Sequence, residues 1–160
     1  MTSYFSSLTT THRSLLAIVL IAGVLRIGWV VYAQTLPGSD FAQYDQLAWR
    51  LAEGKGYVDE FGEPTAFYAI GWPFFLSLVY RVFGHSLVAA GVVNALLGVG
   101  AVILPYAIAR HLLDRPVALI AAALVAINPT LTLYSSTHGT ESLFVFEILL
   151  LTWLILRILA

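Results

Sequence analysis

The sequence has 160 residues, of which 59% are hydrophobic and 11% charged, and its net charge at pH 7 is −1. Soluble domains carry roughly 45–50% apolar and about 25% charged residues, so this composition excludes a soluble globular domain and indicates an all-α integral membrane protein. The near-neutral charge gives no reason to expect nucleic acid as a partner, and the absence of cysteine excludes disulfides and thiolate metal sites.

The first apolar run, residues 14–33, is long enough to cross a bilayer core, which takes about 20 helical residues. Before it, residues 1–13 form a Ser/Thr-rich tail that we expect on the cytoplasmic side. A cleaved signal peptide is the alternative, since Val31-Tyr32-Ala33 loosely resembles a cleavage site. Arg26 and the bulky residues that follow it fit a signal peptide poorly.

The next segment, residues 34–86, holds the most polar stretch of the chain, GSDFAQYDQLAWRLAEGKGYVDE at 38–60. Apolar residues recur there with helical spacing at Phe41, Tyr44, Leu47, Ala48, Leu51 and Ala52. This spacing predicts a short amphipathic helix over residues 40–53 on the membrane surface. Ser39 or Asp40 stands at its expected N-cap, and Gly54 stands at its expected C-cap.

Residues 67–83, FYAIGWPFFLSLVYRVF, are apolar but number only 17, and Gly71 and Pro73 interrupt them. This segment could cross the membrane or lie flat in its interface. The positive-inside rule favours the flat arrangement, because that arrangement places four arginines on the cytoplasmic side. These are Arg13, Arg110, Arg115 and Arg157. We therefore expect two interfacial helices in one outer loop, about four spans, and both ends of the chain inside.

The remaining apolar runs complete one membrane module over residues 14–160. The expected spans cover residues 14–33, 87–109, 117–134 and 143–158, with the outer loop at 34–86. No internal repeat is present.

Two acidic residues, Asp40 and Glu141, stand where helices are expected to begin. Each is explained as a helix cap, a role that contributes about 1 kcal/mol. In the flat topology, however, both approach the same membrane face from different loops. Paired carboxylates there could deprotonate a hydroxyl acceptor or hold a divalent cation. Both interpretations stay open.

Other charged side chains have similarly divided interpretations. Arg26 and Glu147 lie inside apolar runs, where they could pair with each other or be accommodated separately by snorkelling or burial. His138, interpreted as an exposed loop histidine, could bind a phosphate or a metal, or do neither. The cations of the outer loop are candidates for binding an anionic headgroup, with a solvated surface role as the alternative for each. They are Arg50, Lys55 and Arg81.

Taken in order, several segments resemble the N-terminal part of a C-type membrane glycosyltransferase. The likeness is to glycosyltransferase family 39 and its bacterial aminoarabinose-transferase-like relatives. The matching segments are SDFAQYDQLAWRLAEGKGY, PTAFYAIGWPFFLSLVYRVFGHS, NALLGVGAVILPYAIARHLL and ALIAAALVAINPTLTLYSSTHGTESLFVF. No single segment is specific, whereas the ordered series is.

The resemblance implies transfer of a sugar from a polyprenyl-phosphate donor to a lipid, protein or glycan hydroxyl, with inversion, at the outer face of a bacterial or archaeal plasma membrane. It implies that Asp40 is the general base or orients the acceptor, and that Glu141 is a second catalytic acid. No cofactor is implied beyond a divalent cation, which only some relatives use. The expected substrate-binding residues are Tyr44, Asp45, Arg50, Lys55, Arg81 and His138.

The sequence also departs from the family pattern. Many relatives have Asp-Glu where this chain has Asp40-Phe41, and others have Pro-Pro-Gly at 69–71. Family members usually carry more spans, so a partial module is expected. One alternative is a non-catalytic subunit or prenyl-lipid-binding scaffold that works with a partner membrane protein. Another is a small transporter component that uses Arg26 and Glu147; the number of spans and the lack of an expected broken-helix pair weigh against it.

Overall fold

The computed structural model describes residues 2–159, with side chains described from residue 12 onward. Residues 1 and 160, the outer limits of the expected tail and module, lie outside the described residues. The described part is helical and contains no strand beyond an isolated bridge between Val58 and Pro64. Its elements are α1 (Thr2–Ala33), α2 (Asp40–Ala52), α3 (Gly71–Phe83), α4 (Leu87–Leu112), α5 (Arg115–Ala126), α6 (Pro129–Leu133), the short 3-10 helix η1 (Tyr134–Ser136) and α7 (Glu141–Leu159).

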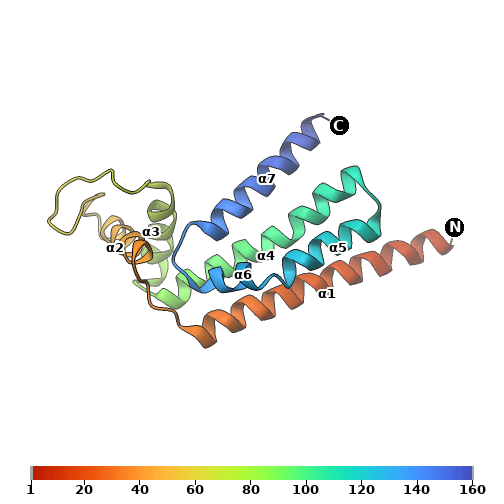
Figure 1. The fold of residues 1–160 in the computed structure, drawn as a ribbon, viewed down its shortest axis with the longest axis horizontal. Coiled ribbons are helices and arrows are strands. Elements are labelled where there is room, and N and C mark those ends of the chain that lie inside the picture. Colours follow the sequence, from red (N-terminus) through yellow and green to blue (C-terminus); the bar gives the residue numbers. More distant parts are fainter. Residues whose placement is uncertain (1, 160) are drawn as a thin grey trace.

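Three of these helices are long and apolar enough to cross a bilayer, namely residues 12–33 of α1, α4 and α7. α5 and residues 129–136 together are also long and apolar enough, with a bend of 50° between them. Counted as one span, this bent pair gives a fourth. Figure 1 shows α1, α4 and α5 side by side, with both marked ends of the chain on one side of the molecule and α2 and α3 on the other. The predicted all-α membrane fold is therefore confirmed.

The third span differs from the continuous helix expected over residues 117–134, because it breaks between α5 and α6. Pro129 has no backbone N–H to donate, and it disfavours the helical conformation of the residue before it. That residue, Asn128, has an extended backbone, and its side chain accepts a hydrogen bond from the Leu131 N–H to begin α6. The break within this span was not expected. It gives one discontinuous span among the described residues, whereas a transporter of this kind has a pair of discontinuous helices in corresponding positions of two repeats.

Small side chains allow α1, α4 and α5 to approach one another closely. Ala22, Val102, Ala122 and Ala126 are almost completely buried and form one cluster. Because lipid is as apolar as these side chains, close van der Waals packing stabilises such contacts more than the hydrophobic effect does.

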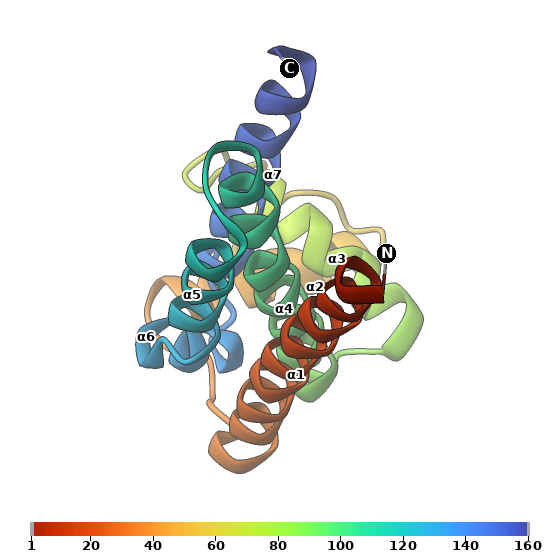
Figure 2. The same cartoon turned by 90° about the vertical axis from the view of Figure 1, so that its right-hand side faces the viewer.

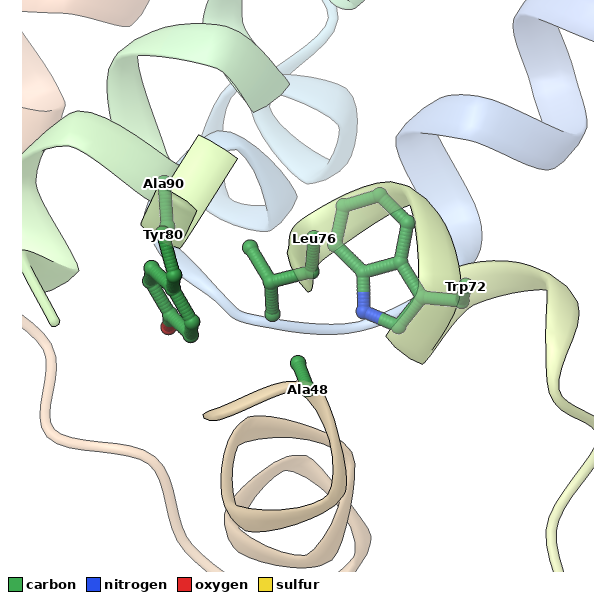
Figure 3. Close-up of a cluster of buried hydrophobic side chains, with 5 residues drawn as sticks. All are labelled: Ala48, Trp72, Leu76, Tyr80 and Ala90. Carbon is green, nitrogen blue, oxygen red and sulfur yellow. The ribbon is translucent and has the colours of Figure 1, made fainter. Parts of the chain in front are cut away.

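The helix α3 is too short to span the membrane and lies across the ends of the long helices (Figures 1 and 2). Its 13 residues extend about 20 Å, against a hydrocarbon core of about 30 Å. Trp72, Leu76 and Tyr80 recur every fourth residue on its buried face, where they meet Ala48 of α2 and Ala90 of α4 (Figure 3). This contact fixes α2 and α3 to the end of the bundle. The helix predicted over residues 40–53 is confirmed as α2.

Candidate functional site

The first turns of α2 and α7 meet at Gly139. A Cβ atom added to this glycine would lie 2.1 Å from Glu141 Oε2 and 2.5 Å from Cε1 of Phe41. The Phe41 ring and the Glu141 carboxylate therefore occupy the space next to the Gly139 backbone. Asp40 immediately precedes Phe41, so the structure brings the two helix starts that carry the predicted acids to one place. No pattern in the sequence marks Gly139, because its neighbour Phe41 is distant in sequence.

Asp40 does not cap its helix through its side chain. Ser39 occupies the N-cap position of α2 and makes no side-chain capping bond. Instead, Asp40 Oδ1 accepts a hydrogen bond of 3.0 Å from the hydroxyl of Tyr68. This hydrogen bond is the main reason that the pKa of Tyr68 is raised. The interpretation of Asp40 as a simple cap is wrong, because its carboxylate is held by a residue 28 positions away.

Tyr44 belongs to the same group, one turn after Asp40 on α2. Its ring contacts that of Tyr68 edge to face, with centroids 5.1 Å apart and an interplanar angle of 71°. Tyr68 thus connects the loop before α3 with both Asp40 and Tyr44. Asp40 itself is exposed, so its carboxylate is accessible to a substrate.

Glu141 is enclosed more than Asp40. Its Oε2 atom is buried and has no hydrogen-bond partner among the described residues. Glu141 is also the first residue of α7, where the positive end of the helix dipole stabilises a negative charge. The helix start therefore stabilises the charge of this carboxylate, while Oε2 itself receives no hydrogen bond from the described residues.

His138 is buried, which corrects its interpretation as an exposed loop histidine. Only 1% of its surface is accessible, and its backbone carbonyl accepts a 2.7 Å hydrogen bond from Trp72 Nε1. Its Nε2 atom lies 3.2 Å from the Leu87 carbonyl oxygen, whereas Nδ1 is buried without a partner among the described residues. Burial lowers the pKa of His138, so the ring is neutral at pH 7.

Asp45 makes its contacts inside the protein. Its carboxylate accepts a hydrogen bond from the Tyr80 hydroxyl and lies 2.9 Å from Nε2 of His85. The ring of Trp49 stacks on His85 with centroids 4.9 Å apart. These contacts join α2 to α3 and give Asp45 a structural role. Tyr80 and His85 were not among the predicted residues, because nothing in their spacing pairs them with Asp45.

The three predicted phosphate-binding cations lie away from Asp40, around the C-terminal end of α2. Arg50 is ten residues after Asp40, a distance of about 15 Å along a helix, and it donates to the Val58 carbonyl. Arg81 donates to the Leu51 carbonyl. Lys55 pairs with Glu53 at 2.7 Å. The structure therefore groups these cations with each other and separates them from the two acids.

Of the two alternatives for Arg26 and Glu147, the structure shows separate accommodation and not a pair. Arg26 is fully buried and donates hydrogen bonds of 2.9 Å to the carbonyl oxygens of Val125 and Ala126. These are the last two residues of α5, whose carbonyls lose their helical partners at the break. Glu147 instead lines a cavity of about 260 Å³ with Trp72, Phe75 and Thr140, among others. Burial against carbonyls, not an ion pair, accommodates the arginine.

No group of three or more His, Asp or Glu side chains that could hold a metal occurs in the described part of the chain.

A comparison with known protein families shows which family this chain belongs to. A sequence profile described as dolichyl-phosphate-mannose-protein mannosyltransferase matches residues 68–160, more than half of the chain. The chain belongs to this family. Its function is accordingly of the polyprenyl-phosphate-sugar glycosyltransferase kind, in a multi-pass membrane protein, and the resemblance seen in the sequence is confirmed. Comparisons with curated proteins and with solved structures gave no match.

The part of the chain that matches the mannosyltransferase family includes one side of the site. Tyr68, His138, Gly139 and Glu141 fall within the matched residues, whereas Asp40 precedes them. The structure connects Asp40 to the matched residues through its bond to Tyr68 and the position of its neighbour Phe41 at Gly139.

Proposed function

We propose that this chain transfers a sugar from a polyprenyl-phosphate donor to a hydroxyl acceptor, with Asp40 as the general base and Glu141 as a supporting acid. The observation that carries the proposal is the meeting of the α2 and α7 helix starts at Gly139, within a member of this glycosyltransferase family. Asp40 is exposed and held by Tyr68, while Glu141 has a buried oxygen without a partner among the described residues.

The proposed reaction is a single displacement at the anomeric carbon of the sugar. Asp40 takes the proton of the acceptor hydroxyl as the acceptor oxygen forms its bond to that carbon. The bond between the anomeric carbon and the phosphate oxygen breaks, and the polyprenyl phosphate leaves with the electron pair. Attack from the side opposite the phosphate inverts the anomeric centre.

Tyr68 and Glu141 position the reacting groups and take no part in making or breaking bonds. The Tyr68 hydroxyl bonds one oxygen of Asp40 and leaves the other to face the acceptor. The half-buried Glu141 carboxylate would accept a hydrogen bond from a hydroxyl of the acceptor or of the sugar. A hydroxyl held by both acids is oriented for attack, which is how proximity lowers a barrier in such a reaction.

Loss of the Asp40 base is the direct test. Asp40→Asn should reduce transfer from a polyprenyl-phosphate sugar by about 10²-fold or more, the usual contribution of a general base, while the protein stays folded. Asp114→Asn is the matched control, because Asp114 lies at the other end of the bundle and makes no side-chain capping bond. Transfer by the Asp40→Asn protein at the wild-type rate would show that Asp40 is not the base, and would favour the non-catalytic scaffold.

The outer face is proposed from charge. Arg110 and Arg115 flank the turn between α4 and α5, at the opposite end of the molecule from α2 and α3 (Figure 1). The positive-inside rule then places α2, α3 and both acids outside. Because the chain has no cysteine, the variants Ser39→Cys and Thr140→Cys should both react with an impermeant maleimide on intact cells. Ser6→Cys and Asp114→Cys should react only after lysis; labelling of Ser39 and Thr140 from opposite sides would contradict the topology.

The structure does not support Arg50, Lys55 and Arg81 as ligands of the donor phosphate. That phosphate is bonded to the anomeric carbon that reacts beside Asp40, whereas Arg50 lies about 15 Å further along α2. Lys55→Gln is the cleanest test, because its side chain is exposed and pairs only with Glu53 in the described structure. We expect an unchanged KM for the donor in Lys55→Gln and in Arg81→Gln. A higher KM with unchanged kcat would return these cations to the donor site.

A further inference from the structure

Glu147 is a charged side chain within a membrane span, and it has no partner among the described residues. It lies six residues after Glu141, about 9 Å along α7, in a helix long and apolar enough to cross the bilayer. No hydrogen bond or ion pair joins it to the described part of the chain. Ionisable residues inside spans are rare, face a cavity or the protein interior, and mark places where another group binds. Glu147 is therefore a candidate binding residue that the proposed transfer reaction does not use.

The cavity beside Glu147 lies between α3 and α7. It measures about 260 Å³. The residues that line it recur at helical spacing on each helix, so one face of α7 looks across the cavity at one face of α3. They are Thr140, Leu143, Phe144 and Glu147 at and along the start of α7, and Gly71, Trp72 and Phe75 on α3.

The side chain of Glu147 leans toward the start of α7. In an α-helix each Cα–Cβ bond tilts toward the N-terminus, so a side chain covers the turn before its own Cα. For Glu147 that turn carries Leu143 and Phe144, both in the cavity lining. The start of α7 lies at the end of the bundle that holds α2 and α3 (Figure 1). Because Phe144 and Glu147 are exposed, the cavity opens on the lipid-facing surface of α7, close to the level of the headgroups.

The lining determines what kind of ligand the cavity can take. Glu147 is the one ionisable side chain among the described lining residues, so the cavity attracts a cation and repels an anion. The hydroxyl of Thr140 adds a second group that can accept a hydrogen bond. Trp72, Phe75 and Phe144 supply aromatic walls, and the faces of such rings also attract cations. The ligand that fits is a cation with N–H donors and an apolar remainder.

We propose that this cavity binds the primary ammonium group of a phospholipid headgroup, that of a phosphatidylethanolamine, with Glu147 as its counter-ion. The bilayer presents such a group at the end of the span where the cavity opens. Three N–H donors on the ammonium match the Glu147 carboxylate and the Thr140 hydroxyl. The acyl chains would lie along the exposed apolar side chains that continue down α7, Ile148 and Leu151. A choline headgroup has the same charge but no N–H donor, so it should bind less tightly.

Lipid binding can be measured without any transfer reaction. The full chain in detergent would be titrated with dioleoyl-phosphatidylethanolamine or dioleoyl-phosphatidylcholine, and bound lipid would be counted by native mass spectrometry. The wild-type chain should bind the ethanolamine lipid about tenfold more tightly than the choline lipid, the effect of one hydrogen bond to a charged group. Equal affinities for the two lipids would overturn the proposal.

Substitution of Glu147 tests the counter-ion. Glu147→Gln removes the charge and keeps the size of the side chain, and we expect this variant to bind the two lipids equally. Glu60→Gln is the matched control, because Glu60 is an exposed carboxylate outside the cavity lining and its loss should leave the preference unchanged. A preference retained by Glu147→Gln would remove Glu147 from the site. If that variant does not fold, a phosphatidylethanolamine acetylated on its amine tests the wild-type chain instead, and binding as tight as that of the free amine would contradict the proposal.

Two further measurements identify the source of the ammonium group and separate this site from the catalytic one. A membrane-spanning peptide of leucine and alanine with one lysine should not displace the ethanolamine lipid; displacement by this peptide, and not by one without lysine, would assign the cavity to a partner helix and refute the lipid. Asp40→Asn should lose transfer and keep the lipid preference, since Asp40 does not line the cavity. The lipid preference in a chain that transfers no sugar would support this site and refute the proposed function, and transfer without the preference would do the opposite.

Discussion

Replacing Gly139 with alanine tests the packing that brings α2 and α7 together. Its backbone does not have the positive φ that would exclude alanine, so the substitution acts only through the added methyl group. That methyl group would lie 2.1 Å from Glu141 Oε2, whereas ordinary contacts begin at 3.4 Å. The carboxylate oxygen must therefore retreat by about 1.3 Å, the difference of these two distances. The Phe41 ring, at 2.5 Å from the new atom, must move as well.

The expected effects differ in size between stability and activity. Overpacking of this kind costs about 1–3 kcal/mol of unfolding free energy. A displacement of about 1 Å at a reacting centre can reduce the rate by about 10²-fold. We therefore expect Gly139→Ala to fold, to melt at a slightly lower temperature, and to lose most of its transfer activity through kcat.

The assay compares initial transfer rates and thermal unfolding of the purified variant with those of wild type. Gly38→Ala is the matched control, because a Cβ there meets no atom within 4 Å and its backbone φ also permits alanine. If Gly139→Ala transferred sugar at the wild-type rate, Glu141 could not be positioning the acceptor from its place next to Gly139.

Three further variants test the supports of the fold. Arg26→Met should lower the unfolding free energy by about 1–3 kcal/mol, measured by denaturation in detergent, because the α5 carbonyls lose their buried donor. Asp45→Asn should destabilise α2 against α3 by a similar amount, seen as faster proteolysis of the loop between them, because Tyr80 and His85 lose a charged partner. Stability should also fall as pH rises above 10, because burial raises the pKa of Tyr80 and only the unfolded chain releases its proton there. Tyr80→Phe should weaken this dependence, and an unchanged slope would contradict the cause given.

The sequence predicted the elements of this fold well where periodicity and length decide them. The helix at residues 40–53 follows from apolar spacing, and α3 follows from an apolar run too short to span. The break before Pro129 could also have been predicted from the sequence, since a proline inside a helical pattern usually ends or kinks the helix. It was missed because the apolar character of the chain continues through it.

The site was less accessible to sequence reasoning because its contacts join distant segments. Asp40 and Glu141 could be proposed as a pair from topology, but the Tyr68 bond to Asp40 and the place of Gly139 depend on how α2, α3 and α7 pack. The burial of His138 has the same origin, since Trp72 and Leu87 enclose it from other helices. Arg26 shows the limit most clearly. Its partners are backbone carbonyls, which no residue identity reveals.

The contact of Arg26 also has a consequence for how the protein is made. Its carbonyl acceptors lie 99 and 100 residues further along the chain, so α1 leaves the ribosome long before α5 exists. An arginine at the centre of a lone inserting helix costs about 2.5–3.5 kcal/mol. During synthesis α1 therefore enters the lipid at a disadvantage that disappears only when α5 arrives. The first helix is expected to stay beside the translocon until the third span can join it, which makes their release into the bilayer a coupled event.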